Sequence, residues 1–296
     1  MQIERANAKI NFYLNVVGRR ENGYHNIVSI MQTVSLCDLV SVELVPAAQT
    51  KIALAVSGSM ELPTDSRNLA WRAAECFLQH THLTAEVQIN LQKHIPMSAG
   101  LAGGSADAAA VLRALNHLCG KPFTTEELSQ IGSELGADVP FCVCGGAMLA
   151  TGVGEILERV PAMPSCTLVV AIGEDRISTP KAYAALDEKH NFFEHPREQG
   201  ADVQELIDLW QNDALAASCA CFYNVFEDVI PEDNTDVDTI KRLMRQSGAL
   251  CAMMSGSGPA VFGVFETPEE AEKASAILQE KGFQSFVCHP SGQYIE

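Results

Sequence analysis

The alternation of apolar and polar residues predicts that the first part of the chain is rich in β-strands. Residues 8–17 alternate with a period of two, which is typical of a half-buried strand. Its apolar face consists of Ile10, Phe12, Leu14 and Val16. Its other face consists of Lys9, Asn11, Tyr13 and Asn15. Taken alone, this strand favours a polar face exposed to solvent, although a lysine and an asparagine two residues apart also point at the same space.

The same patterns predict the other elements of the N-terminal part. Further strands are expected at residues 27–36, 39–45, 51–57, 86–91, 147–151 and 155–160. Capping residues at 65–68 precede a helix at 69–79, and the Thr124-x-x-Glu127 capping-box pattern opens a helix that ends near Leu135. An alanine-rich helix is predicted at 106–118, with Ser105 near its N-cap.

The second half of the chain alternates strands and helices. Strands are expected at 167–172, 250–254, 260–265 and 283–288, and helices at 179–187, 203–211, 237–246 and 268–281. Residues 191–203 are expected to form a polar loop of uncertain shape. A strand–turn–strand–helix–strand order around the glycine-rich turn 255–259 suggests a ferredoxin-like α+β unit. Because Pro161–Pro164 is a natural linker, we expect two domains, 1–160 and 161–296.

Composition narrows the class of protein. The 296 residues are 47% hydrophobic and 19% charged, which is typical of a soluble globular protein. A formal charge of −17 argues against nucleic acid or an anionic membrane as a partner. The first residues show no apolar core of signal-peptide length, no segment approaches 18 uninterrupted apolar residues, and the cysteines lack the spacing of a zinc site. We therefore expect a cytoplasmic protein with reduced thiols.

The segment from Pro96 to Ala110 is the first candidate for chemistry. It has glycines at positions 100, 103 and 104, and it leads from a predicted strand into the alanine-rich helix. Glycines let a backbone approach a ligand, and a helix N-terminus offers free N–H groups and about half a positive charge. The segment is therefore either a cradle for an anion such as phosphate or a tight loop before a closely packed helix, with equal weight. It matches neither Walker A nor GxGxxG.

Two other segments carry candidate binding or catalytic residues. The pair Asn22-Gly23 predicts a tight turn that brings Tyr24 and His25 to a loop tip, where binding residues often lie. The alternative is a tyrosine covering a sheet edge beside a surface histidine. Asp138 lies among small and apolar residues, so its carboxylate has to be paired or chemically poised. On this evidence a helix or turn cap is the more common outcome.

Four separated blocks together resemble the GHMP small-molecule kinase superfamily, which includes galacto-, homoserine, mevalonate and phosphomevalonate kinases. The blocks are Ala8–Asn11 with Gly23–His25, Pro96–Ala109, Gly136–Phe141 and Met254–Pro259. They follow in the order of the family, which makes a chance match remote. The resemblance is strongest to the branch that phosphorylates a cytidine-diphosphate-linked methylerythritol in the non-mevalonate route to isoprenoid precursors.

The resemblance implies an α+β fold of two domains, the first like ribosomal protein S5 and the second ferredoxin-like, with the active site in the cleft between them. It implies ATP and Mg²⁺ as cofactors and phosphorylation of the acceptor's 2-hydroxyl group. Asp138 matches the catalytic base and Lys9 the lysine beside it. A neighbouring ammonium would hold the aspartate ionised, so that it can accept the hydroxyl proton.

The other site residues are carried over by position. ATP is expected to bind Asn68, Lys93, Pro96, Met97, Ser98, Ala99, Gly100, Leu101, Ala102, Gly103, Gly104 and Ser105, the last being also a candidate Mg²⁺ ligand. The acceptor is expected to bind Asn11, Tyr24, His25, Asp138, Thr179 and Tyr183, the two tyrosines by stacking on cytosine. The chain departs from the family at Ala102, where glycine is commoner, and at Ser105-Ala106, which replaces a serine pair.

Two other hypotheses are kept. Another kinase of the superfamily would act on a different small alcohol, and the Gly23-Tyr24-His25 signature argues against this. A non-catalytic nucleotide-binding regulator on the same fold is disfavoured by the presence of both Lys9 and Asp138. We expect a monomer or a weak homodimer that binds neither nucleic acid nor membrane.

Overall fold

Strands and helices alternate along the chain in a computed structural model, which describes residues 1–59, 62–190 and 202–294. The first half contains β1 (Gln2–Arg19), β2 (His25–Pro46), β3 (Lys51–Ser57), α1 (Leu69–Thr81), β4 (Ala85–Gln92), α2 (Gly103–Leu118), α3 (Thr125–Ser133), α4 (Val139–Cys144), β5 (Ala147–Thr151) and β6 (Ile156–Arg159). The second half contains β7 (Thr167–Ile172), α5 (Thr179–His190), α6 (Asp202–Gln211), α7 (Leu215–Ser218), η1 (Cys219–Cys221), β8 (Tyr223–Asn224), η2 (Val225–Val229), α8 (Asp236–Gln246), β9 (Cys251–Met254), β10 (Val261–Phe265), α9 (Pro268–Glu280) and β11 (Gln284–Cys288).

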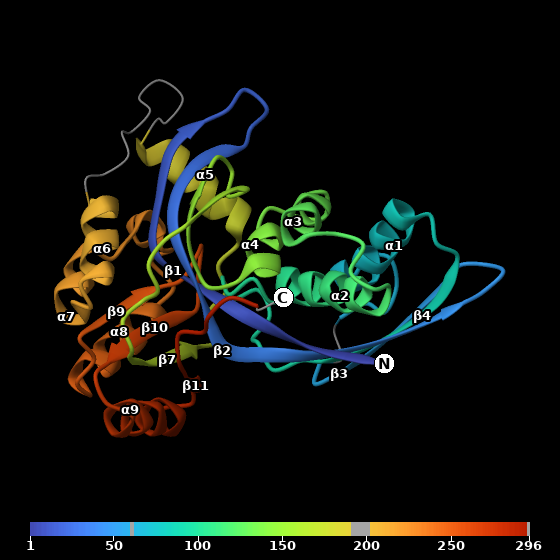
Figure 1. Cartoon of the computed structure of the whole chain (residues 1–296). Coiled ribbons are helices and arrows are strands. Elements are labelled where there is room, and N and C mark those ends of the chain that lie inside the picture. Colours follow the sequence, from blue (N-terminus) through green and yellow to red (C-terminus); the bar gives the residue numbers. More distant parts are fainter. Residues whose placement is uncertain (60–61, 191–201, 295–296) are drawn as a thin grey trace.

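Two sheets organise these elements (Figure 1). The larger has seven strands, in the order β3-β4-β2-β1-β8 with β5 paired to β2 and β6 to β5; the smaller has four, in the order β11-β7-β10-β9. Helices α1 and α2 pack on the larger sheet, and α8 and α9 pack on the smaller one. No helix in the described part of the chain is both long and apolar enough to span a membrane.

Most of the predicted elements are confirmed. Strands β3, β5 and β7 have the predicted bounds, and α3 begins with the predicted capping box at Thr124 and Glu127. The strands predicted at 27–36 and 39–45 are one continuous strand, β2. The sequence patterns did not indicate α4 or the short elements of residues 215–229. Residues 191–201 of the predicted polar loop lie outside the described residues.

The alanine-rich helix begins earlier than predicted. Helix α2 starts at Gly103 with Ala102 as its N-cap, so Ser105 lies in the first turn and not near the cap. Ala102 has a left-handed backbone (φ 56°), which costs an alanine about 1–2 kcal/mol. This strain explains the advantage of glycine at that position. Residues 106–112 of the helix are all buried, and the four alanines among them let α2 approach β1 and α1 closely.

The polar face of the first strand is buried, so the prediction of a solvent-exposed face is wrong. Strand β1 lies between β2 and β8, and every residue from Ala6 to Val16 is buried. Lys9 is 5% exposed and Asn11 is 3% exposed. Because buried polar groups need hydrogen-bond partners, these two side chains must find theirs inside the protein.

The two glycine-rich turns of the chain lie against each other. The Ser255 hydroxyl donates to the Gly100 carbonyl oxygen at 3.2 Å, and the Ala260 N–H donates to the Ala99 carbonyl oxygen at 3.1 Å. On the opposite side, the Lys9 N–H donates to the Leu101 carbonyl oxygen at 3.1 Å. The loop at residues 96–102 is therefore held between β1 and the turn that follows β9.

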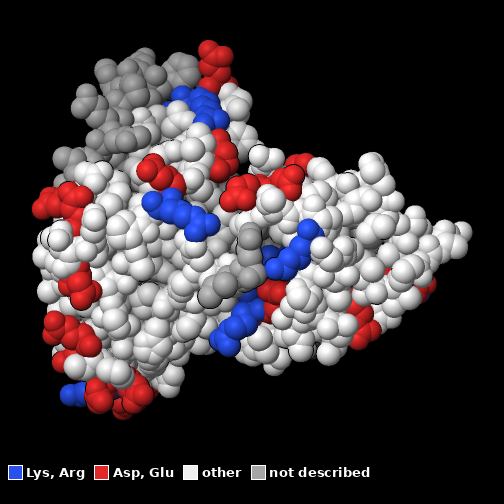
Figure 2. Space-filling view, viewed as in Figure 1, with Lys and Arg blue, Asp and Glu red and all other residues white. Residues whose placement is uncertain are grey.

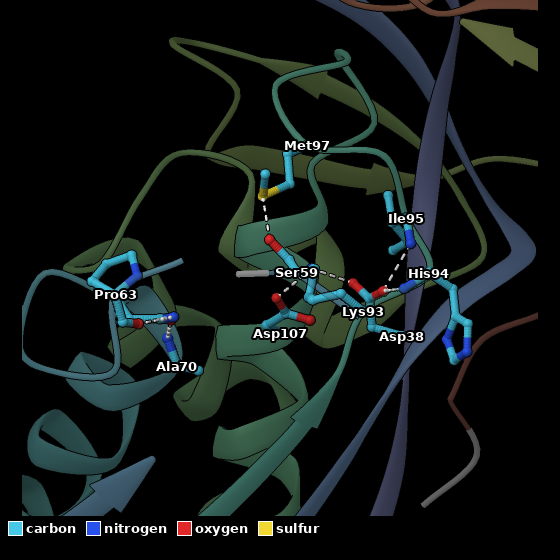
Figure 3. Close-up of polar contacts among 10 residues, drawn as sticks. Asp38, Ser59, Pro63, Ala70, Lys93, His94, Ile95, Met97 and Asp107 are labelled. Carbon is cyan, nitrogen blue, oxygen red and sulfur yellow. Dashed lines mark hydrogen bonds and ion pairs between the residues drawn. The ribbon is translucent and has the colours of Figure 1, made fainter. Parts of the chain in front are cut away.

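A buried ion cluster of Asp38, Lys93 and Asp107 ties β2, the end of β4 and α2 together (Figure 3). The Lys93 ammonium is 2.6 Å from Asp107 Oδ2 and also pairs with Asp38. Asp38 additionally accepts from the N–H groups of His94 and Ile95, which fixes the chain as it enters the glycine loop. Two carboxylates share one ammonium in a buried site, so the ionised form of the second carboxylate is disfavoured.

The close contact of the two glycine turns makes Gly100 a sensitive position. Gly100 and Gly23 both have a positive φ (80° and 86°), so alanine at either costs about 1–2 kcal/mol of strain. A Cβ at Gly23 would meet nothing within 4 Å, whereas a Cβ at Gly100 would collide with the Ser255 carbonyl oxygen. Urea denaturation should give a loss of about 1–2 kcal/mol for Gly23→Ala and about 3 kcal/mol or more for Gly100→Ala. Equal losses would contradict the contact.

The two carboxylates of the ion cluster should respond differently to neutralisation. Asp38→Asn removes the acceptor of two backbone N–H groups and breaks a buried ion pair, so the free energy of unfolding should fall by about 3 kcal/mol or more.

Burial is the main cause that raises the pKa of Asp107 to about 8. The folded state therefore retains a proton that the unfolded chain releases near pH 4, and this group lowers stability as the pH rises from about 4 to about 8.

Asp107→Asn removes that titration. Its free energy of unfolding should depend less on pH between about pH 5 and pH 8 than that of the wild type, as measured by urea denaturation. An unchanged pH dependence, or a loss at neutral pH as large as that of Asp38→Asn, would show that Asp107 stays ionised in the folded protein.

Candidate active site

A cavity of about 580 Å³ lies between the N-termini of α1 and α2 and the loop at residues 96–102. Every residue predicted to bind ATP lines it: Asn68, Lys93 and all residues from Pro96 to Ser105. The first turn of α2 receives no side-chain cap, because its N-cap residue is Ala102. Its N–H groups are therefore able to bind an anion in the cavity.

Asn68 and Lys93 shape the wall of this cavity through their bonds to protein groups. Asn68 caps α1: its amide oxygen accepts from the Ala70 N–H at 3.0 Å, and its amide nitrogen donates to the Pro63 carbonyl oxygen at 2.9 Å. Lys93 is held in the ion cluster described above. The second oxygen of Asp107 is buried without a hydrogen-bond partner among the described residues.

Lys9 and Asn11 form a hydrogen-bonded chain on the buried face of β1. The Lys9 ammonium donates to Asn11 Oδ1 at 2.5 Å, and Asn11 Nδ2 donates to the Ser29 hydroxyl at 2.8 Å. Ser29 in turn donates to the Tyr13 carbonyl oxygen at 2.7 Å. These bonds orient the Asn11 amide with its oxygen toward the ammonium, so Lys9 is fixed next to the glycine loop that its own N–H anchors.

Asp138 occupies the N-cap position of α4, but its carboxylate makes no capping hydrogen bond. The interpretation as a helix cap therefore holds for its position and not for its side chain. Burial raises the pKa of the Cys142 thiol, the charge of Asp138 raises it further, and the charge of Lys9 lowers it. Both charges are thus near the same thiol, although Lys9 and Asp138 form no ion pair with each other in the described residues.

An aromatic cluster lies within electrostatic reach of Asp138. The His25 ring stacks on Tyr183 of α5, with 4.6 Å between centroids and 25° between planes. Tyr183 packs edge-on against Phe226, with centroids 4.9 Å apart. Burial, and after it the charge of Asp138, raises the pKa of Tyr183 to about 12. The structure thus brings together three of the residues predicted to bind the acceptor.

Tyr24 and Thr179 lie apart from this stack. Tyr24 is 63% exposed at the tip of the β1–β2 hairpin, where Gly23 makes the predicted turn. Thr179, at the start of α5, shares a hydrogen bond of 2.7 Å with the Ser257 hydroxyl of the second glycine turn. The hairpin tip and α5 therefore carry residues predicted to bind the acceptor, and they come from both halves of the chain.

Sequence reasoning missed the residues that hold these side chains in place. Asp187 binds His25 at 2.7 Å and lies one helical turn after Tyr183, a spacing that could have revealed it. Asp38 is 55 residues from Lys93 and gives no local signal. Asp107 lies inside the glycine-loop block but, in the linear sequence, has no visible partner.

Family models match both halves of the chain. The model for the GHMP kinases N terminal domain matches residues 68–146, and that for the GHMP kinases C terminal matches residues 204–284. Among solved structures, a crystal structure of 4-(cytidine 5'-diphospho)-2C-methyl-D-erythritol kinase is 32% identical, covers 98% of this chain and all of its own, and superposes with a TM-score of 0.79. A homoserine kinase from Cytophaga hutchinsonii, 20% identical with a TM-score of 0.72 over 99% of this chain and 97% of its own, shares the fold.

Curated relatives match along nearly the whole chain. The 4-diphosphocytidyl-2-C-methyl-D-erythritol kinase of Desulfitobacterium hafniense (strain Y51) is 40% identical over 291 residues, which cover 96% of this chain and 94% of that protein. The enzyme of the same name from Clostridioides difficile (strain 630) is 36% identical over 99% of this chain and 96% of its own. The predicted α+β kinase fold is therefore confirmed, and the chain belongs to the GHMP kinase family, in the branch of the 4-diphosphocytidyl-2-C-methyl-D-erythritol kinases.

Proposed function

We propose that this chain transfers the γ-phosphoryl group of ATP to the 2-hydroxyl group of 4-diphosphocytidyl-2-C-methyl-D-erythritol, a step of the non-mevalonate pathway to isoprenoid precursors. One observation carries the assignment: the charges of the uncapped Asp138 carboxylate and of the buried Lys9 ammonium both act on Cys142 of α4. Asp138 also acts on Tyr183 of the aromatic cluster, and the Lys9 N–H is bonded to Leu101 of the cavity wall. A base and a cation between two ligand sites are what phosphoryl transfer to an alcohol needs.

Asp138 acts as the general base in this proposal. Its carboxylate takes the proton of the acceptor hydroxyl as the oxygen attacks the γ-phosphorus, and the bond from that phosphorus to the bridging oxygen of ADP breaks. The Lys9 ammonium, oriented by Asn11, stabilises the negative charge on the transferring group. The N–H groups of the first turn of α2 hold the phosphates in the cavity.

Mg²⁺ belongs to the proposal as the ion that accompanies ATP. Ser105 fits as a ligand, because it lines the cavity in the first turn of α2 and a hydroxyl is the kind of oxygen donor that Mg²⁺ accepts. When bound, the ion would neutralise charge on the phosphate oxygens. The residues of the chain contribute the positioning of those oxygens through α2 and Lys9.

The acceptor's cytosine is assigned to the hairpin tip and α5. Tyr24 offers an exposed ring face, and the next residue, His25, forms a half-buried stack with Tyr183. Stacking on aromatic rings holds a base, and an imidazole adds hydrogen bonding at its edge. Asn11 and Thr179 complete the acceptor side near Lys9 and the second glycine turn.

We extend the proposal to the organisation of the molecule. A boundary near residue 160 is supported by the four-stranded sheet, all strands of which follow Pro161–Pro164. A cytoplasmic monomer or weak homodimer that binds neither nucleic acid nor membrane is supported by the net charge of −17. Figure 2 shows acidic side chains scattered over both halves of one face, with most of its basic side chains near the middle.

Asp138→Asn should abolish most turnover and leave nucleotide binding intact. The amide cannot accept the hydroxyl proton, so kcat should fall by about 10²- to 10⁴-fold, whereas the Kd of ATP measured by calorimetry should stay within about twofold. Asp213→Asn removes the same charge from an exposed turn and serves as the control. Normal turnover of Asp138→Asn would remove Asp138 from the mechanism.

Tyr24→Ala should weaken acceptor binding selectively. Loss of one stacking face costs about 1–3 kcal/mol, so the acceptor KM should rise by about 10- to 100-fold while the ATP KM changes little. Tyr24→Phe keeps the ring and should behave like the wild type. Equal rises in both KM values would refute the stacking role. Measured across a panel of small alcohols, the same assay also separates this substrate from those of other kinases of the superfamily.

A further inference from the structure

We propose that Asp187 is a positioning residue that makes His25 a hydrogen-bond acceptor toward the nucleobase, so that the site selects cytosine over uracil. The proposal rests on the proposed function, because it concerns the cytidine part of that acceptor. It adds a residue and a basis of selectivity to the acceptor site.

The contact between the two side chains is short and sheltered. His25 Nε2 lies 2.7 Å from Asp187 Oδ1, and the side chains are 8% and 20% exposed. Arg19 Nη1 lies 3.1 Å from the other oxygen, Oδ2. Each carboxylate oxygen therefore has its own donor.

An ionised carboxylate only accepts hydrogen bonds, so the proton in this contact has to be on His25 Nε2. In a neutral imidazole the other nitrogen, Nδ1, then carries a lone pair and accepts. Within the described parts of the chain, the only hydrogen bond of the His25 ring is the one to Asp187. The remaining nitrogen is thus available to a ligand as an acceptor.

Helix α5 holds the same imidazole in two ways. Tyr183 covers a face of the ring, and Asp187, one helical turn later, binds its edge. Phe226 packs edge to face against Tyr183. These contacts fix both the plane and the rotation of the His25 ring, so its acceptor nitrogen points in one direction. A fixed direction is needed for the ring to distinguish one base edge from another by hydrogen bonding.

The chemistry of the two pyrimidines turns this arrangement into selectivity. Cytosine carries an exocyclic amino group that donates at C4, whereas uracil carries a carbonyl oxygen there. The Nδ1 lone pair of His25 accepts a hydrogen bond from the amino group of cytosine. With uracil the same lone pair would face the lone pairs of the carbonyl oxygen, and the two would repel each other. A site built around one hydrogen bond rejects the analogue that leaves it unpaired more strongly than an apolar pocket does.

The test compares two acceptors on the wild type and on Asp187→Ala. One acceptor carries cytidine and the other is the same compound with uridine. Without Asp187 the imidazole can adopt either neutral form, so kcat/KM for the cytidine compound should fall by about tenfold and the cytidine-to-uridine preference should shrink by a similar factor. The ATP KM should not change, and Asp187→Glu should recover part of the preference.

A matched control removes a comparable pair elsewhere. His80 Nε2 lies 3.0 Å from Glu134 Oε1 on the surface of the α1–α3 region, and Glu134→Gln should leave the preference unchanged. The second readout is spectroscopic: ¹⁵N chemical shifts of His25 should show a protonated Nε2 and a bare Nδ1 in the acceptor-bound wild type, and a mixture of the two neutral forms in Asp187→Ala.

An unchanged cytidine-to-uridine preference in Asp187→Ala, or an Nδ1-protonated or doubly protonated His25 in the wild-type complex, would overturn the inference while leaving the kinase activity standing. A wild-type protein that phosphorylates neither acceptor would overturn the proposed function and this inference together.

Discussion

The contact between the two glycine turns is the constraint on which the rest of the site depends. The glycine loop is bonded to β1 through Leu101 on one side and to the second turn through Ala99 and Gly100 on the other. A side chain at Gly100 has no room, since the carbonyl of Ser255 occupies its place. The backbone of the cavity and the strand that carries Lys9 therefore form one unit, and phosphates bound at the loop would have a fixed position relative to the ammonium.

The charge of the protein explains why this unit is built mainly from backbone groups. With a net charge of −17 the molecule repels ATP at a distance, and a binding site has to overcome that locally. The lysine on the cavity wall adds no net attraction, because Lys93 is shared by Asp38 and Asp107. The N-terminus of α2 and the Lys9 ammonium can supply local attraction, and each acts over a short range.

The sequence predicted what local patterns determine and missed what distant partners determine. The capping box at Thr124 and the bounds of β3 and β7 follow from residues within a few positions of one another. Alternation in β1 predicted a solvent-exposed polar face, but Asn11 is buried. Its hydrogen-bond partner, Ser29, lies on another strand and could not be seen from the local pattern. For the site, resemblance supplied the residues lining the cavity, whereas the ion cluster and Asp187 depend on contacts that only the folded chain brings together.

The two ligand sites also differ in how they join the halves of the chain. Among the residues that the structure describes, those lining the proposed nucleotide cavity lie between 62 and 107, in the first half of the chain. The residues proposed for the acceptor side come from both halves, His25 from the hairpin and Tyr183 with Asp187 from α5, and Arg19 adds a further bond between the same two elements. A cytosine bound between them would contact both halves, whereas ATP would contact one. Any change in the relation of the halves should therefore act on recognition of the acceptor before it acts on the nucleotide, and the side chains around His25 are where that coupling lies.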